Sequence, residues 1–124
     1  MNIKIKIGDQ IELKADLYKT QTGEKIYQAL PLQGKGGTWG EEIYFSTAVE
    51  APLEEEAQEV VQRGDLAYWP DIQAFCIFYG PTPASRGDEI RAAGPVNVVG
   101  KITDDVSVLK KVEGTVEVTV EEEG

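Results

Sequence analysis

The chain has 124 residues, of which 41% are hydrophobic and 27% charged, and its formal net charge at pH 7 is −10. This size suits a single domain, residues 1–124, built around one hydrophobic core. The acidity argues against nucleic-acid or membrane-surface binding, because both attract basic patches and the longest basic run is Lys110-Lys111. No apolar run approaches the roughly 18 residues of a membrane helix, and no signal-peptide pattern follows Met1, so a cytoplasmic location is expected.

Two absences narrow the chemistry further. The chain contains no histidine, which removes the commonest general base and the imidazole ligand of many metal sites. Its one cysteine, Cys76, lies in the most apolar run, and a buried, inert thiol is expected there. The sequence therefore predicts no metal site, no cofactor and no disulfide.

The first segments predict a hairpin and a helix. Apolar and polar residues alternate over 2–7, which predicts a strand with one buried face. A turn at Gly8-Asp9 and a second alternation over 11–17 complete the hairpin. Residues 20–30 are predicted to form a short helix that Thr22 caps and the following proline ends.

The next part of the chain is rich in glycine and then in glutamate. The run 34–40 is predicted to be a surface loop, because its glycines lack the spacing of a phosphate-binding loop. Trp39 within it is a candidate lid or partner contact. A strand is predicted at 43–45. Residues 52–62 are predicted to be a helical or irregular excursion whose three glutamates form a solvated face, since they are not spaced around a sharp turn as a cation loop requires.

The rest of the chain is expected to be organised around the stretch Gly64–Pro83. It contains two apolar runs, 66–69 and 74–79, that are rich in aromatic and β-branched residues. Glycine or proline bounds each run and polar residues separate them, which is typical of two core strands joined by a tight loop.

The last third alternates loop, strand and helix signals. Residues 82–94 hold the prolines and glycines of a loop, with a short strand near Ile90. A buried strand is predicted at 95–102, a second short helix at 104–112 and a final strand at 116–121. Strands dominate the count, which favours a mainly β, closed barrel over a layered α/β sheet.

Three blocks of the chain occur in an order shared with a known family. They are the opening hairpin with its helix, the aromatic-rich pair of strands, and the strand 98–102 with the helix after it. In this order the chain resembles the cyclophilins, the prolyl-isomerase family, and more closely the compact prokaryotic cyclophilin-like proteins. The resemblance implies a closed cyclophilin-like β-barrel of about eight strands with two short helices. The compact group also shares Glu42-Ile43-Tyr44-Phe45, Gly64–Pro70 and Gly80–Pro83.

The departures from the cyclophilins concern catalysis. Cyclophilins carry an arginine in a Phe-His-Arg strand segment, where it stabilises the twisted prolyl amide, and the corresponding segment 43–45 has no arginine. The tryptophan and histidine of a later cyclophilin groove loop have no counterpart either. The resemblance therefore implies the fold without the usual catalytic side chains, and no catalytic residue is assigned.

A ligand groove is predicted from strand alternation. Alternation along 75–79 separates Phe75 and Ile77 from Cys76 and Phe78. Because cysteine is usually buried, Cys76 and Phe78 are predicted to fill the barrel interior, so that Phe75 and Ile77 face the groove. The alternative is that the aromatic residues only cover the barrel. The candidate ligand-binding residues are Tyr44, Trp69, Phe75, Ile77 and Arg86.

Three functional hypotheses follow. The first is a protein that binds a peptide or small-molecule ligand in an apolar groove, with little or no prolyl isomerase activity. The second is an active isomerase that uses Arg86 or Arg91 in place of the missing arginine. The third is an interaction module whose exposed aromatic residues, Trp39 included, form the interface of a homo-oligomer.

Overall fold

The structure, a computed structural model, describes residues 1–123. Within that range the chain forms nine strands, one α-helix, α1 (Gln21–Ala29), and two short 3₁₀ helices, η1 (Pro70–Ile72) and η2 (Val106–Lys111). The strands are β1 (Asn2–Ile7), β2 (Ile11–Leu17), β3 (Leu32–Thr38), β4 (Glu42–Ser46), β5 (Gln58–Val61), β6 (Asp65–Trp69), β7 (Ala74–Phe78), β8 (Ile90–Ile102) and β9 (Val116–Glu122).

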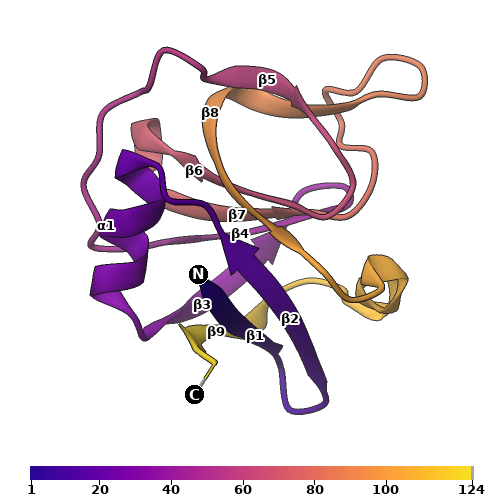
Figure 1. Cartoon of the computed structure of the whole chain (residues 1–124). Coiled ribbons are helices and arrows are strands. Elements are labelled where there is room, and N and C mark those ends of the chain that lie inside the picture. Colours follow the sequence, from indigo (N-terminus) through magenta and orange to yellow (C-terminus); the bar gives the residue numbers. More distant parts are fainter. Residues whose placement is uncertain (124) are drawn as a thin grey trace.

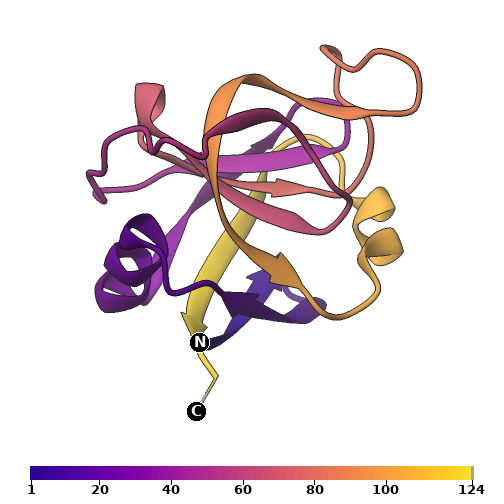
Figure 2. The same ribbon diagram turned by 45° about the horizontal axis from the view of Figure 1, so that its top comes forward.

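Eight of the strands form a closed ring. Their order is β2-β1-β9-β3-β4-β7-β6-β8, and pairing of β2 with β8 joins the two ends. The closure is antiparallel, with Ala15 opposite Ile102 and Leu17 opposite Gly100. The ninth strand, β5, pairs with β8 outside the ring. Helix α1 lies beside the ring (Figures 1 and 2). The predicted mainly β fold with a closed sheet of about eight strands is confirmed.

The alternating segments became strands because one of their faces is buried. In β1, Ile3, Ile5 and Ile7 are buried while the lysines between them remain partly exposed. The same period of two is seen in β2 and β9, which flank β1 in the ring. Burial of one face also sets the register, since a slip by one residue would turn the isoleucines to solvent.

The prediction of a surface loop over 34–40 is wrong for residues 34–38, which are strand, whereas Trp39 and Gly40 lie in the bend that follows. Residues 32–38 form β3, which pairs with β9 and β4 in the ring. A Cβ at Gly36 would lie 2.8 Å from the side chains of Ile43 and Val118. Glycine is therefore required here by the close approach of neighbouring side chains.

A second correction concerns β5 and β8. The predicted excursion over 52–62 is irregular only as far as Ala57, and the edge strand β5 follows it. The predicted loop 82–94 ends at Glu89, and β8 runs without interruption for 13 residues through Pro95. Proline is tolerated there because the register of β8 against β5 shifts between its pairings at Val96 and Arg91.

The helices begin at different residues from those predicted. The N-cap of α1 is Thr20, whose hydroxyl accepts a hydrogen bond of 3.0 Å from the Gly23 amide. Thr22, the predicted cap, is buried in the first turn. The second predicted helix is the 3₁₀ helix η2, capped by Asp105. Across residues 1–123, no helix has the length and apolar character needed to span a membrane.

The buried residues form two clusters. The larger fills the ring and joins side chains of α1 and η2 to those of most ring strands. The smaller lies on the opposite face of β6 and β7 and includes residues of β5 and of the first half of β8. Since β5 and β8 fold over that face, the aromatic-rich pair of strands is buried on both sides.

Candidate functional site

The structure does not place Phe75 and Ile77 in a groove. Both side chains are fully buried, at 0% exposure, in the larger cluster inside the ring. Cys76 and Phe78, which were predicted to fill the interior, belong to the smaller cluster. The face assignment is therefore wrong. The assignment assumed that a buried cysteine marks the face of β7 that points into the ring. Because both faces of β7 are covered, a buried cysteine does not distinguish between them.

Tyr44 and Trp69 each lie at the margin of the smaller cluster, on the two strands that flank β7. Both are partly buried, and the register places Tyr44 opposite Cys76 and Trp69 opposite Ala74. Among the described residues, Trp69 Nε1 is a buried side-chain nitrogen without a hydrogen-bond partner. The two aromatic rings pack beside the same cluster, and their predicted role in ligand binding stays a prediction.

The two arginines of the isomerase hypothesis are not among the residues that fill the ring. Arg86 is exposed in the loop that precedes β8, where its amide donates to Glu89. Arg91 lies on β8 and forms ion pairs with Glu89 and with Glu59 on β5. The side chain of Arg91 is thus held by ion pairs on the paired strands β5 and β8 and the loop before β8.

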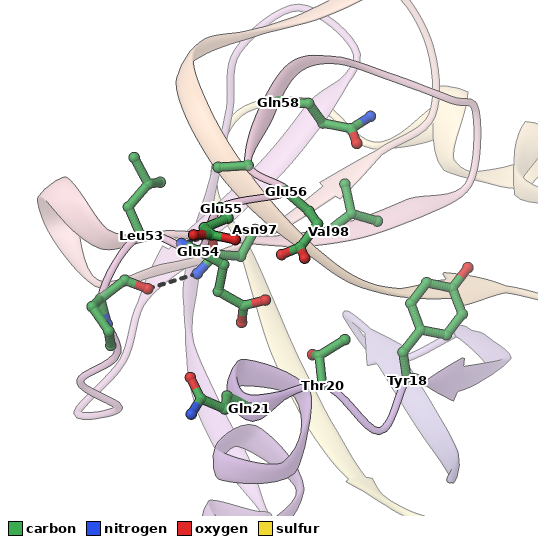
Figure 3. Close-up of a pocket in the computed structure, with 12 residues that line it drawn as sticks. Tyr18, Thr20, Gln21, Leu53, Glu54, Glu55, Glu56, Gln58, Asn97 and Val98 are labelled. Atoms are coloured by element: carbon green, nitrogen blue, oxygen red, sulfur yellow. Dashed lines mark hydrogen bonds between the residues drawn. The ribbon is translucent and has the colours of Figure 1, made fainter.

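A large cleft lies elsewhere, beneath the segment that connects β4 to β5. This segment, residues 47–57, is called the strap below. The cleft has a volume of about 760 Å³ and is open to solvent (Figure 3). The strap forms one wall, residues 18–21 before and at the start of α1 form the other, and β8 forms the floor. Its lining residues are Tyr18, Thr20, Gln21, Pro52, Leu53, Glu54, Glu55, Glu56, Ala57, Gln58, Asn97 and Val98.

A buried polar network fixes the strap over the floor of the cleft. Asn97 on β8 is 2% exposed, and its Nδ2 donates to the Pro52 carbonyl at 3.0 Å and to Thr22 Oγ1 at 3.1 Å. Its Oδ1 accepts from the Glu54 amide at 2.8 Å. The Glu54 carboxylate accepts from the amide of Thr22 at 3.1 Å and from its hydroxyl. Three segments far apart in sequence are thereby joined, and every hydrogen-bonding group of the Asn97 amide is engaged.

The other end of the strap is also anchored. The Tyr68 hydroxyl and the Gln73 side-chain amide both donate to the carbonyl of Val49. Lys25 on α1 donates to the carbonyl of Glu50 at 3.1 Å. The strap is thus held from Val49 to Glu54, although this part of it has no regular secondary structure.

The cleft combines negative charge with exposed apolar surface. Three consecutive glutamates of the strap line it, and no lysine or arginine is among its lining residues. Figure 3 shows the side chains of Glu54 and Glu56 directed from the strap towards Thr20. Tyr18, 38% exposed, and Leu53, 50% exposed, are two of the four exposed large hydrophobic side chains of the described chain. This combination suits a ligand with a positive charge and an apolar body.

Tyr18 lines the cleft with an uncharged phenol ring. Partial burial and the carboxylates of Asp65 and Asp16 raise the pKa of the Tyr18 phenol. Its ring therefore offers an uncharged aromatic face to the cleft at neutral pH.

In residues 1–123, no three histidine, cysteine or acidic side chains are grouped closely enough to hold a metal ion. The glutamates of the strap are thus arranged along a wall and do not converge on one point.

A second acidic group is buried away from the cleft. Glu42 on β4 is 5% exposed, and burial raises the pKa of its carboxyl to about 7, against a smaller lowering by the Cys76 thiol. Burial and then the Glu42 charge raise the pKa of the Cys76 thiol well above its usual value. Cys76 is buried, as the sequence predicted, and its raised pKa favours the protonated thiol.

Sequence reasoning missed the residues that build the cleft. Asn97 stands within the apolar run 96–99, and a lone polar residue in such a run is a signal of a buried hydrogen-bond network. The strap was predicted only as an acidic excursion. Nothing local indicates that it folds back over the start of α1, because the contacts with Thr22 and Asn97 join residues 32 and 43 positions away.

The fold and the site define a small β-protein with a closed ring of strands and a cleft beneath a strap. A family model described as Cyclophilin-like matches residues 1–121. The chain therefore belongs to the cyclophilin-like family, and the resemblance seen in the sequence is confirmed. It is also similar to the hypothetical protein AF2241 from Archaeoglobus fulgidus, known from its solution structure. The two chains are 38% identical, the match covers 98% of this chain and 94% of that chain, and the TM-score is 0.82. Among curated proteins, none matches the chain.

Proposed function

We propose that the protein binds a small organic cation, or a cationic side chain of a peptide, in the cleft beneath the strap. The observation that carries the proposal is the chemistry of the cleft walls, where three glutamates and an exposed tyrosine meet without a lysine or arginine. The proposal retains a peptide or small molecule as the ligand. It moves the binding site from the surface around Phe75 to the cleft between the strap and α1.

Size and charge both support a small cationic ligand. A volume of about 760 Å³ lies within the roughly 300 to 1,000 Å³ that is usual for small-molecule sites. Carboxylates at the mouth of a cleft attract a cation and lower the energy of the bound state. The neutral ring of Tyr18 adds attraction between a cation and an aromatic face. An anionic ligand would meet repulsion from the same wall.

Phenethylammonium is a suitable first probe, because it joins one positive charge to an apolar ring. We expect it to shift the amide NMR signals of Tyr18, Glu56 and Val98, and to bind more tightly than phenethyl alcohol, its neutral analogue. Binding should weaken as sodium chloride is raised, since exposed charges are screened. Equal binding of the amine and the alcohol, or signal shifts confined to other surfaces, would contradict the proposal.

Glu56 supplies a sharper test of the charge. Its side chain is exposed and directed into the cleft, and it is free of the network that holds Glu54. Glu56→Gln is expected to weaken phenethylammonium binding by about five-fold, which corresponds to roughly 1 kcal/mol for one partly screened charge. Glu12→Gln, an exposed change on β2 with the same effect on net charge, should leave the affinity nearly unchanged. A loss of the same size in both variants would mean that only net charge matters.

We further expect little or no prolyl isomerase activity. Strand β4 has no arginine at the position where cyclophilins place theirs, and Arg91 is held in ion pairs with Glu59 and Glu89. Loss of one charged donor to a transition state costs on the order of 100- to 1,000-fold in rate. A protease-coupled assay on an Ala-Pro tetrapeptide measures this. Turnover close to that of an ordinary cyclophilin would refute the expectation, and its loss in Arg86→Ala or Arg91→Ala would support the isomerase hypothesis.

A further inference from the structure

Within residues 1–123, strand β5 leaves one sheet edge without a neighbouring strand. The other eight strands close into the ring, whereas β5 is the terminal strand of the sheet order and pairs with β8 alone (Figure 1). Its first three residues, Gln58, Glu59 and Val60, are exposed. Open edges are usually blocked by lysine, proline or a bulge, because they can pair with another chain. Residues 58–61 contain neither lysine nor proline, and their protection is limited to a short length and a shift in register.

The open edge continues directly from the cleft. Ala57 and Gln58 line the cleft, and Gln58 is also the first residue of β5. The side-chain amide of Gln58 donates to the carbonyl of Val60 at 2.7 Å. That carbonyl is thus satisfied by a local, exposed side chain, which an incoming backbone amide can displace. A segment lying along β5 would therefore lead into the cleft at its end.

The charge around β5 favours a basic segment of a partner protein over a second copy of this chain as the occupant of the edge. Glu55, Glu56 and Glu59 are exposed beside or on the edge, and only Glu59 has a basic partner, Arg91. Two copies meeting at this edge would bring these glutamates together on chains that each carry a net charge of −10. A segment that carries lysine or arginine would instead meet opposite charge along the edge and in the cleft.

We propose that β5 accepts an extended, basic segment of a partner protein by strand addition, with one lysine or arginine side chain of that segment entering the cleft. Backbone hydrogen bonds along β5 give affinity in this mode, and the cleft gives specificity for the basic side chain. The inference rests on the proposed function, because the cleft receives the cationic side chain. The strand addition itself depends on β5 and can be tested separately.

A seven-residue peptide in which lysine alternates with threonine and valine is the probe, with capped ends. The first control is the same peptide with glutamate in place of lysine. Two further controls are N-methylated at alternate residues, so that each blocks the backbone amides on one edge of the extended peptide. Binding to the full chain is followed by fluorescence anisotropy at low salt and by amide NMR shifts. We expect the lysine peptide to shift the signals of residues 57–61 and the glutamate peptide to have no effect. One N-methylated version should bind at least five-fold more weakly than the other, since only one set of amides faces β5.

The outcomes separate the two proposals. If phenethylammonium binds but both N-methylated peptides bind as well as the parent, strand addition is refuted while the cleft function stands. If the peptide binds along β5 but the amine does not bind, the edge is a docking site and the cleft function fails. The remaining possible occupant of the edge is a second copy of this chain, which light scattering of the protein alone detects. A dimer whose formation shifts the amide NMR signals of residues 57–61 without peptide would overturn the choice of a basic partner.

Discussion

Replacing Asn97 with alanine is expected to lower the free energy of unfolding by about 3 kcal/mol, because it leaves buried hydrogen-bonding groups without partners. The Asn97 amide satisfies the Pro52 carbonyl, the Thr22 hydroxyl and the Glu54 amide, and it is 2% exposed. In a chain of this length such a loss lowers the midpoint of thermal unfolding by roughly 10 °C. Urea unfolding of the two proteins at one pH measures it.

The same change should loosen the strap more than the ring. Hydrogen exchange of the Glu54 amide should accelerate strongly in Asn97→Ala, because that amide donates directly to the lost side chain. Amides that pair β1 with β9 should be affected only through global stability. Asn2→Ala, an exposed asparagine on β1, is the matched control and should be close to neutral. A loss below about 1 kcal/mol in Asn97→Ala would show that the network contributes little to stability.

A double-mutant cycle tests whether the network acts as a unit. Thr22→Val removes the hydroxyl that accepts from Asn97 and donates to Glu54, while retaining the shape of the side chain. Because the two residues share a hydrogen bond, their combined effect should fall short of the sum by about 1 kcal/mol. Additive losses would mean that Asn97 and Thr22 stabilise the strap independently.

The second large effect is a dependence of stability on pH that arises from Glu42. Burial raises the pKa of this carboxyl from 4.5 to about 7 in the folded chain. A raised pKa in the folded state means that the folded chain holds the proton more tightly than the unfolded chain. The contribution to stability is therefore fully present below pH 4.5 and is lost as the pH rises through about 7. Between these limits the free energy of unfolding should fall by about 3 kcal/mol on account of this group.

Glu42→Gln isolates this contribution. The glutamine side chain does not ionise, so the free energy of unfolding of the variant, relative to that of the parent, should rise from pH 5 to pH 8.5. Urea unfolding at each pH measures this difference. Glu117→Gln, which removes an exposed carboxylate from β9, controls for the general effect of net charge. A constant difference between Glu42→Gln and the parent across this range would refute the assignment.

Several strands of the ring could be predicted from local pattern alone. The alternation over 2–7, 11–17 and 116–121 marks strands with one buried face, and β1, β2 and β9 follow it closely. The apolar runs of Gly64–Pro83 likewise became β6 and β7. In these segments the information lies within a few neighbouring residues, so tertiary contacts confirm a preference that is already present.

The errors fall where long-range packing overrides that preference. β3 has the composition of a loop, yet it is a strand because Gly36 permits Ile43 and Val118 to approach closely. β5 and the first half of β8 pair with each other and cover the outer face of β7, which buries both faces of that strand. For this reason Phe75 and Ile77 could not be assigned to the correct face from alternation alone.

By itself, the sequence determined the fold class and the acidic, histidine-free chemistry, because these depend on composition and short periodic patterns. The family was indicated by the order of three motif blocks and is shown by the family model. Only the tertiary structure revealed the cleft beneath the strap, where we propose that a ligand binds. The strap closes over β8 through Asn97, Thr22 and Glu54, whose contacts join residues separated by 32 to 75 positions. Asn97 within its apolar run signals a buried network, but the partners that complete the network lie too far along the chain for a local pattern to identify them.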